Sequence, residues 1–364
     1  MRYRPTVAEI DLDAIRSNVR AVKPPDAELM TVVKADAYGH GAVPVARAAL
    51  EAGATWLGVA LVEEGVALRE AGIDARILVL SEFPPGSEAA AVEASLTPTV
   101  YSEAAIDRLA SVARSRDLGV HLKVDTGMHR VGVYPPEAAG DLAKRVDAAA
   151  LRLEGLWTHL AKAEDDAATD DQLERFSRAR EAVEASGGVP EILHAANSAG
   201  AARRQDARFD LVRVGIETYG LEPAPGVSTP GVRPAMTVRS EVSFAKRLPA
   251  GERVSYGLEY ELADAATIAT VPIGYADGYR RAFSSTAEAL LGGKRRRVAG
   301  AVTMDQILLD CGDDRIEQGD EVILIGTQDG QRVTADELGE IAGTIGYEIV
   351  SVIGRRVPRE YLGA

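Results

Sequence analysis

The chain has 364 residues, of which 46% are apolar and 26% charged, and its formal net charge is −14. Domains average roughly 150 residues, so this length predicts two domains, each large enough to bury a core. The ordinary composition excludes a disordered or fibrous chain, and the negative charge argues against nucleic acid or an anionic membrane as a partner.

The N-terminal residues carry no export signal. Residues 1–11 are polar and lack an apolar segment, and no run approaches the roughly 18 apolar residues that a membrane span needs. The lone Cys311 cannot form an intramolecular disulfide. We therefore expect a cytoplasmic protein.

Short apolar runs alternate with longer amphipathic segments over the first two thirds of the chain. The runs cover residues 29–33, 56–61, 76–80, 96–100, 120–124, 153–157, 192–195 and 211–214. Apolar residues at helical spacing lie between them, as in 43–52, 63–71, 102–116 and 171–185. This alternation predicts parallel βαβ units and a closed (β/α)8 barrel of the TIM type. An open doubly wound sheet is the alternative, but its glycine fingerprint is absent.

The pattern changes near residue 236, where apolar and polar residues begin to alternate. This alternation, typical of half-buried antiparallel strands, covers 236–244, 266–273, 297–302, 306–310 and 321–326. The Pro- and Gly-containing segment 229–234 reads as a connection. We predict the barrel over 1–235 and a mainly β domain over 236–364, with the first ten or so residues as candidates to pair with the second domain.

Polar residues follow several of the barrel runs. Lys34 ends the first run at a Gly-rich turn, and the apolar residues before it predict a partly desolvated amine suited to Schiff-base chemistry. Comparable positions follow the later runs: Lys123, His159, Ser198 and Arg213. Because the carboxyl ends of barrel strands share one face, we expect these side chains to converge there.

These residues resemble the motifs of the alanine racemase family that uses pyridoxal phosphate (PLP). The resemblance runs nearly end to end, from residues 8–12 to 356–359, and its most specific segments are 33–41, 123–128, 197–198 and 274–278. It implies that Lys34 holds PLP through an imine. It also implies that two subunits pair head to tail and complete each other's sites.

The resemblance assigns further residues to the cofactor. Ser198, Tyr38 and the backbone N–H groups of Gly215 and Ile216 are expected at the phosphate, where barrel loops after the last two strands commonly bind anions. Arg213 is expected at the pyridine nitrogen, with His194 behind it. A guanidinium leaves the ring a weaker electron sink than a carboxylate would, which favours reprotonation over transamination.

Racemisation needs a proton removed from one face of Cα and returned on the other. The resemblance implies Lys34 as one acid/base group and Tyr256 of the second subunit as the other. A phenol with a pKa near 10 is a poor base at neutral pH, so we expect His159 and Arg213 to assist it.

The remaining expected site residues bind the substrate or support the residues that do. The resemblance places Arg130 at the substrate carboxylate, with Met304 and Asp305 contributed by the partner subunit, and makes Lys123 a candidate for a carbamate. His40, His121 and His129 are expected to be structural or surface residues. No histidine spacing fits a zinc motif, so no metal is expected.

The implied activity is interconversion of L- and D-alanine, supplying D-alanine for peptidoglycan. Arg355 stands where many members of the family have a tyrosine, so serine or another small amino acid is an alternative substrate. A PLP-dependent decarboxylase and a non-catalytic PLP-binding protein are further alternatives. Arg213 in place of a carboxylate argues against the decarboxylase, and the domain that carries Tyr256 argues against the carrier.

Overall fold

The structure, a computed structural model, describes residues 3–113 and 118–364. It divides into two compact units. The barrel unit comprises residues 14–37 and 42–233, and the β unit comprises the residues up to Asp13, residues 38–41 and residues 234–364. The last residues of the helix predicted over 102–116 lie outside the described part.

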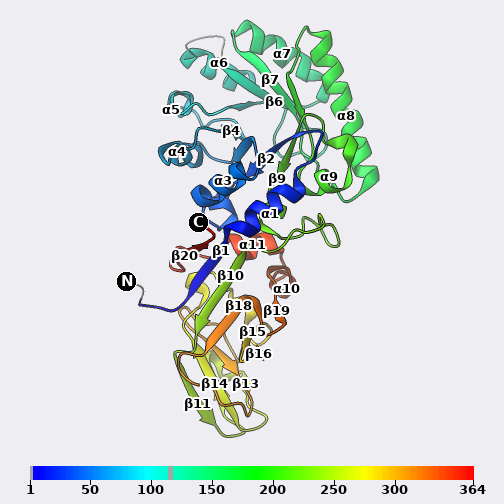
Figure 1. Cartoon of the computed structure of the whole chain (residues 1–364). Helices are drawn as coiled ribbons and strands as arrows, with labels where there is room; N and C mark the ends of the chain where they lie inside the picture. Colours follow the sequence, from blue (N-terminus) through cyan, green and yellow to red (C-terminus); the bar gives the residue numbers. More distant parts are fainter. Residues whose placement is uncertain (1–2, 114–117) are drawn as a thin grey trace. The chain divides into compact units, whose positions relative to one another are not determined.

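The wall of the barrel unit consists, over the described residues, of eight parallel strands (Figure 1). They are β2 (Glu28–Val32), β3 (Trp56–Val59), β4 (Arg76–Val79), β5 (Thr99–Val100), β6 (Gly119–Lys123), β7 (Arg152–Trp157), β8 (Ile192–His194) and β9 (Leu211–Val214). Each predicted apolar run overlaps one of these strands, so the predicted barrel is confirmed.

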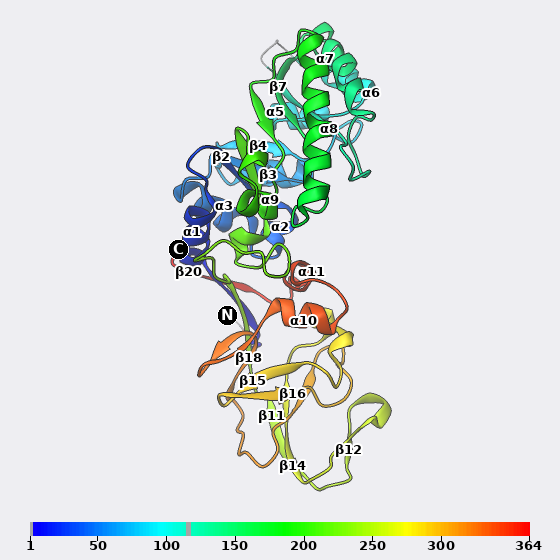
Figure 2. The ribbon, with the colours of Figure 1, turned by 90° about the vertical axis from the view of Figure 1, so that its right-hand side faces the viewer.

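The helices of the barrel unit comprise one that precedes its first strand and others that lie between or after its strands. They are α1 (Leu12–Val22), α2 (Lys34–Tyr38), α3 (Ala42–Glu51), α4 (Val62–Glu70), α5 (Glu88–Glu93), α6 (Glu103–Val112), α7 (Ala139–Ala148), α8 (Asp166–Ala185) and α9 (Ser198–Arg203). The helices α7 and α8 lie side by side (Figure 2). Gly140 permits this contact, because a Cβ there would lie 2.6 Å from the carbonyl oxygen of Ala182.

Hydrogen bonds close the barrel. The strands pair in the orders β4-β3-β2-β9 and β5-β6-β7-β8. A parallel bridge between Leu78 and Thr97 joins β4 to the segment before β5. The N–H of Asp210 donates to the carbonyl of Leu193 at 3.0 Å, which joins β9 to β8.

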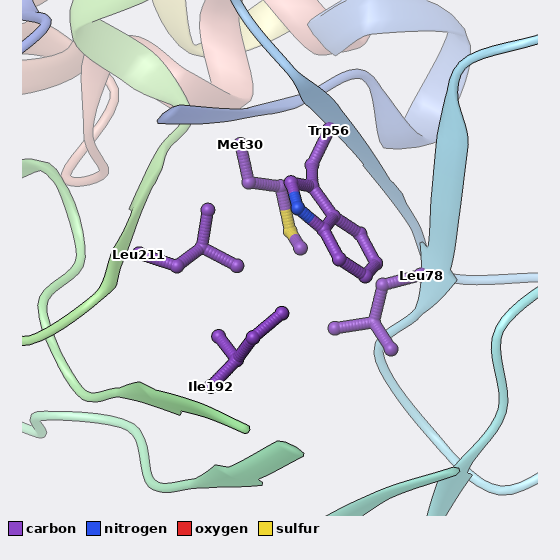
Figure 3. Close-up of a cluster of buried hydrophobic side chains, with 5 residues drawn as sticks. All are labelled: Met30, Trp56, Leu78, Ile192 and Leu211. Carbon is purple, nitrogen blue, oxygen red and sulfur yellow. The ribbon is translucent and has the colours of Figure 1, made fainter. Parts of the chain in front are cut away.

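Apolar side chains from five strands fill one end of the barrel interior (Figure 3). Met30, Trp56, Leu78, Ile192 and Leu211 come from β2, β3, β4, β8 and β9, and none is more than 9% exposed. This packing explains why the strands read as nearly continuous apolar runs: both faces of each strand are buried.

The β unit contains, within the described chain, a seven-stranded sheet in the order β16-β15-β18-β10-β1-β20, with β19 paired to β18. Its strands are β1 (Val7–Asp11), β10 (Met236–Glu241), β15 (Glu288–Leu291), β16 (Lys294–Arg297), β18 (Glu321–Gln328), β19 (Gln331–Val333) and β20 (Arg359–Leu362). Strand β1 pairs antiparallel with β10 and parallel with β20, so the first strand of the chain belongs to this sheet.

Two smaller sheets and two helices complete this unit. The sheets are β11-β14-β17 (Phe244–Leu248, Ala266–Val271, Ile307–Asp310) and β12-β13 (Arg253–Val254, Tyr260–Glu261), and the helices are α10 (Ala335–Ile341) and α11 (Gly346–Ser351). The prediction of a strand over 297–302 is wrong. Strand β16 ends at Arg297, and the buried residues Val298, Ala299 and Val302 lie in the connection that follows.

The described residues include no helix that meets the length and apolarity needed for a membrane span.

Candidate active site

The chain makes an unusual turn directly after the first barrel strand. Lys34 begins α2, whose next three residues have left-handed dihedrals, with φ near 53° at Ala35, Asp36 and Ala37. L-amino acids pay about 1–2 kcal/mol each for this conformation. Strain of this kind is concentrated at functional sites, so the turn makes Lys34 a candidate functional residue.

Hydrogen bonds within the barrel unit hold this turn. The carboxylate of Glu64 accepts from the N–H of Ala35 at 2.6 Å, and Asp36 Oδ1 accepts from the N–H of Ala42 at 2.8 Å. The other Glu64 oxygen accepts from the N–H groups of Ala60 and Leu61 at 2.8 and 3.1 Å, at the start of α4. Sequence reasoning missed Glu64, although its place in the first turn of a predicted helix is a capping position.

The amine of Lys34 is more easily deprotonated than a surface lysine. Burial lowers the pKa of Lys34, the positive charge of Arg130 lowers it further, and the carboxylate of Glu64 opposes the shift. A larger fraction of free amine favours attack on a carbonyl group.

Arg213 is buried inside the barrel and fixed from several sides. Its guanidinium donates to the carbonyls of Thr158 and Ala195 at 2.8 and 2.9 Å. It also donates to Nδ1 of His194 at 2.9 Å and to Nδ1 of His159 at 3.3 Å. Burial lowers the pKa of Arg213 to about 9, which leaves it a cation at neutral pH.

The two histidines beside Arg213 are neutral. Burial lowers the pKa of both His159 and His194 well below the usual range, and the charge of Arg213 adds to the effect. A neutral imidazole can accept the hydrogen bond that the guanidinium donates.

Lys123 adds a further amine to this interior. Its side chain is buried, and Nζ lies 4.3 Å from the ring centroid of Trp157. Burial, followed by the charges of Arg213 and Arg130, lowers the pKa of Lys123 to about 7. Near neutral pH this amine is therefore about half unprotonated.

Positive charge exceeds negative charge in this cluster of Lys34, Lys123, Arg130 and Arg213. The charge of Arg130 lowers the pKa of Lys34, and the charges of Arg213, Arg130 and Lys34 lower that of Lys123. All four cations lower the pKa of His159. Arg130 is exposed, and no carboxylate of the described residues pairs with it. An assembly of mutually repelling cations is suited to binding an anionic ligand.

Ser198 and the chain after β9 lie together. The N–H of Gly215 donates to Ser198 Oγ at 3.1 Å, and Asn197 caps α9 by accepting from the N–H of Gly200 at 3.0 Å. The N–H of Ile216 has no acceptor among the described residues. A buried N–H without a protein partner beside a hydroxyl offers donors for an anionic group.

The predicted site residues of the β unit are mostly exposed. Tyr256 is 75% exposed in a short turn after Ser255, and Met304 is 52% exposed. Asp305 pairs with Arg356 at 2.7 Å. The segment before Met304 is fixed, because the N–H of Tyr275 donates to the Thr303 carbonyl at 3.0 Å.

Tyr38 also belongs to the β unit. Its ring lies 6.2 Å, centroid to centroid, from that of Tyr347. Burial raises the pKa of the Tyr38 phenol to about 12, so it acts as a neutral hydrogen-bond donor.

The histidines expected to be structural or superficial differ among themselves. His40 and His121 are buried, whereas His129 is exposed and lies 3.4 Å from Asp125. No cluster of His, Cys, Asp or Glu suited to a metal occurs within residues 3–113 and 118–364.

The fold and the charged cluster define the class of this protein. It is a barrel enzyme with a second, mainly β unit, and the cations at the carboxyl ends of its barrel strands are suited to an anionic ligand. The model of the alanine racemase N-terminal domain matches residues 10–223, and that of the C-terminal domain matches residues 235–361. The chain belongs to the alanine racemase family and is an amino-acid racemase, an isomerase.

Individual relatives extend over the whole length of the chain. It is 49% identical to an alanine racemase of Symbiobacterium thermophilum and 47% identical to one of Thermobifida fusca, with at least 98% of each chain covered. The solved alanine racemase of Streptomyces lavendulae has a TM-score of 0.94 at 42% identity, covering 100% of this chain and 98% of that one.

Proposed function

We propose that this racemase interconverts L- and D-alanine with PLP, as a homodimer whose subunits share their active sites. The observation that carries the proposal is the partly buried Lys34, with its lowered pKa, among cations at the barrel mouth. We further propose that the enzyme works in the cytoplasm and supplies D-alanine for peptidoglycan.

The residues of the barrel unit fit the chemistry of this cofactor. Ser198 and the N–H groups of Gly215 and Ile216 would hold the phosphate, together with the Tyr38 phenol. Arg213 would donate to the pyridine nitrogen, and Lys34 would bind the aldehyde carbon. When bound, PLP supplies an electron-withdrawing ring that acidifies the Cα–H of an amino acid.

Lys34 is proposed to exchange the proton on one face of Cα. A general acid/base works best when its pKa lies near the operating pH, and the shift of the Lys34 pKa is toward neutrality. The strained turn fixes the backbone from which this side chain extends.

Tyr256 of the partner subunit is proposed to exchange the proton on the opposite face. Its exposure is consistent with a group that acts at a neighbouring subunit rather than in its own core. The cations of the barrel mouth would stabilise a phenolate there, since opposite charge favours the ionised form, and His159 would assist through hydrogen bonding.

Substrate binding is proposed to depend on Arg130, with Met304 and Asp305 of the partner subunit. The unpaired guanidinium can form charge-assisted hydrogen bonds to the substrate carboxylate. A carbamate on Lys123 would turn a repelling cation into an anion that holds Arg130. This modification needs the neutral amine, and a pKa of about 7 makes that form available in Lys123 near neutral pH.

A small substrate is supported by the relatives. The alanine racemase of Bacillus anthracis, 38% identical with a TM-score of 0.94, was solved with bound L-Ala-P. We propose alanine as the substrate here, with serine as the competing assignment to be tested beside it.

Borohydride reduction tests the cofactor assignment. Reducing the purified enzyme should leave a PLP mass tag on the peptide that contains Lys34, and K34A should carry none. A tag on another lysine would contradict the assignment. In parallel, deuterium wash-in at Cα should occur with either enantiomer of alanine and be slower with serine.

Mixing two inactive variants tests the shared site. K34A and Y256F homodimers, unfolded together and refolded, should form mixed dimers that each contain one intact site. Recovery of about a quarter of wild-type activity is expected from random pairing of the subunits. If no activity returns while mixed dimers are present, Lys34 and Tyr256 do not act across subunits.

A further inference from the structure

A chain of buried polar side chains leads away from Arg213 into the barrel. His194 Nε2 lies 2.8 Å from Nδ1 of His121, and Nε2 of His121 lies 3.7 Å from a carboxylate oxygen of Glu154. Both imidazoles are fully buried, and Glu154 is 5% exposed. The chain therefore runs from the guanidinium near the carboxyl ends of the strands toward their amino ends.

Two glycines make room for this chain. A Cβ at Gly155, which pairs with His121 across β6 and β7, would lie 2.3 Å from Nδ1 of His121. A Cβ at Gly119 would lie 2.4 Å from the Glu154 carboxylate. The imidazole and the carboxylate thus occupy volume that any larger residue at these positions would fill.

Aromatic rings fix the orientation of both imidazoles. Trp157 stacks on His194 with centroids 5.3 Å apart and an interplanar angle of 7°. Trp56 meets His121 edge to face at 5.3 Å. The ring nitrogens are consequently directed along the chain by packing as well as by hydrogen bonds.

The donor at one end determines the position of each proton. A guanidinium only donates, so Nδ1 of His194 must accept and its proton must lie on Nε2. That proton is donated to Nδ1 of His121, which places the His121 proton on Nε2, facing Glu154. Burial lowers the pKa of both imidazoles, which keeps them neutral. With both rings neutral, only one arrangement of the ring protons satisfies the chain.

The far end is held negative by arginines. Arg152 and Arg76 lie 3.5 and 3.7 Å from Glu154. Although burial opposes ionisation, His121 and these arginines lower the pKa of Glu154. At 3.7 Å the contact is longer than a hydrogen bond, and Nε2 of His121 has no hydrogen-bond partner among the described residues. The negative charge of the carboxylate still favours the tautomer that directs N–H toward it, so the other tautomer is disfavoured.

We propose that His121 and Glu154 are positioning residues for Arg213, which they hold through His194 by fixing the tautomers of both imidazoles. The role assigned to Arg213 rests on the proposed function, whereas the order of protons does not. Loss of the carboxylate would allow His121 to turn its donor toward His194, which would then present an N–H to the guanidinium. Arg213 would lose one partner and its fixed position.

Ring nitrogen NMR tests the order of protons directly. The chain has five histidines, so ring-¹⁵N-labelled holoenzyme gives few signals, which H121N and H194N assign. His121 and His194 should both carry the proton on Nε2. A proton on Nδ1 of either residue, or a doubly protonated ring, would overturn the proposal.

A matched pair of variants tests the role of the carboxylate. E154Q should give His121 a mixture of tautomers, whereas E191Q should not, although Glu191 also pairs with Arg152, at 2.6 Å. With alanine, E154Q should lower kcat about tenfold at nearly constant KM, the effect of losing one hydrogen bond to a charged group. It should also raise the pyruvate formed per racemisation turnover, because transamination of alanine passes its amino group to the PLP, which becomes pyridoxamine phosphate, and releases the keto acid. E191Q should do neither.

E154D, which keeps a carboxylate, provides the rescue and should restore the tautomers and most of the turnover. If E154Q does not fold, E154D is compared with H121N instead, with the same measurements of kcat and pyruvate ratio. H121N removes the imidazole but keeps a hydrogen-bond acceptor for His194. Ordered tautomers with unchanged kcat and pyruvate ratio in E154Q would overturn the positioning role. A wild type that lacks racemase activity would refute the proposed function instead, while the nitrogen signals would still test the order of protons.

Discussion

Two proposed site residues of the barrel unit and two of the β unit differ sharply in exposure. In the barrel, Lys123 and Arg213 are 3% and 2% exposed and lie among charges of the same sign. In the β unit, Tyr256 and Met304 are 75% and 52% exposed. The first pair lies in a dense interior, and the second pair is exposed on a turn and a loop.

This difference separates two tasks. Buried cations cannot relax away from one another, so the barrel maintains an electrostatic field that a ligand finds already formed. Exposed side chains gain a fixed position only when another surface covers them. Under the proposed dimer, the buried pair would be in place within one subunit, and the exposed pair would be fixed by the second.

The largest effect is expected from the barrel side. K34A should lower alanine racemisation at least about 10³-fold, since it removes both the covalent attachment and one acid/base group. K123A, which removes a neighbouring amine, is the matched control and should retain more activity. The racemisation rate of both variants is measured by circular dichroism of alanine. An active K34A would refute the proposed role of Lys34.

Y256F should slow the exchange of the Cα proton with solvent unequally for the two enantiomers, measured as deuterium wash-in into L- and into D-alanine. Loss of a single acid/base group costs about 10²–10⁴-fold, and it should fall on proton exchange from one enantiomer far more than from the other. Y260F serves as control, because the Tyr260 hydroxyl instead contacts Asp310 at 2.9 Å. Equal losses for both enantiomers in Y256F would contradict a base that serves one face.

Stability should follow the same contrast without involving catalysis. L211A empties a fully buried position of the barrel interior and should cost about 2–5 kcal/mol of unfolding free energy. F244A, on the exposed strand β11, should cost less than about 0.5 kcal/mol. Urea denaturation of the holoenzyme compares them, and similar midpoints would show that the barrel interior contributes less than its burial indicates.

The smallest effect concerns pH. The pKa of Lys123 is lowered to about 7, so its neutral fraction should increase about tenfold between pH 6 and pH 8. A carbamate formed from labelled bicarbonate should grow over this interval in the ¹³C spectrum and be missing in K123R. The same shift affects stability. Above pH 7 Lys123 binds more protons in the unfolded chain than in the folded one, so the free energy of unfolding should increase as the pH rises toward 10.

Periodicity predicted the barrel well because its strands are buried on both faces and its helices are amphipathic. It failed at residues 297–302, where buried apolar residues lie in a connection, and it did not identify the short helices α10 and α11. Tertiary packing decides such segments, and a local pattern does not contain that information.

For the site, strand ends and family motifs predicted roles for Lys34, Lys123, Ser198 and Arg213 from the sequence alone, and these roles stay predictions. Glu64, Glu154 and the contact of His121 with His194 were not found. Their partners are distant in sequence, and a lone histidine or glutamate in a strand gives no signal of a hydrogen-bonded chain.

The left-handed turn at Ala35, Asp36 and Ala37 has a consequence for engineering. Glycine adopts such dihedrals without a steric penalty, so A35G should relieve strain and increase thermal tolerance. The same exchange would widen the range of backbone shapes available next to the reactive amine. At this turn, selection for heat resistance and selection for speed should favour different amino acids.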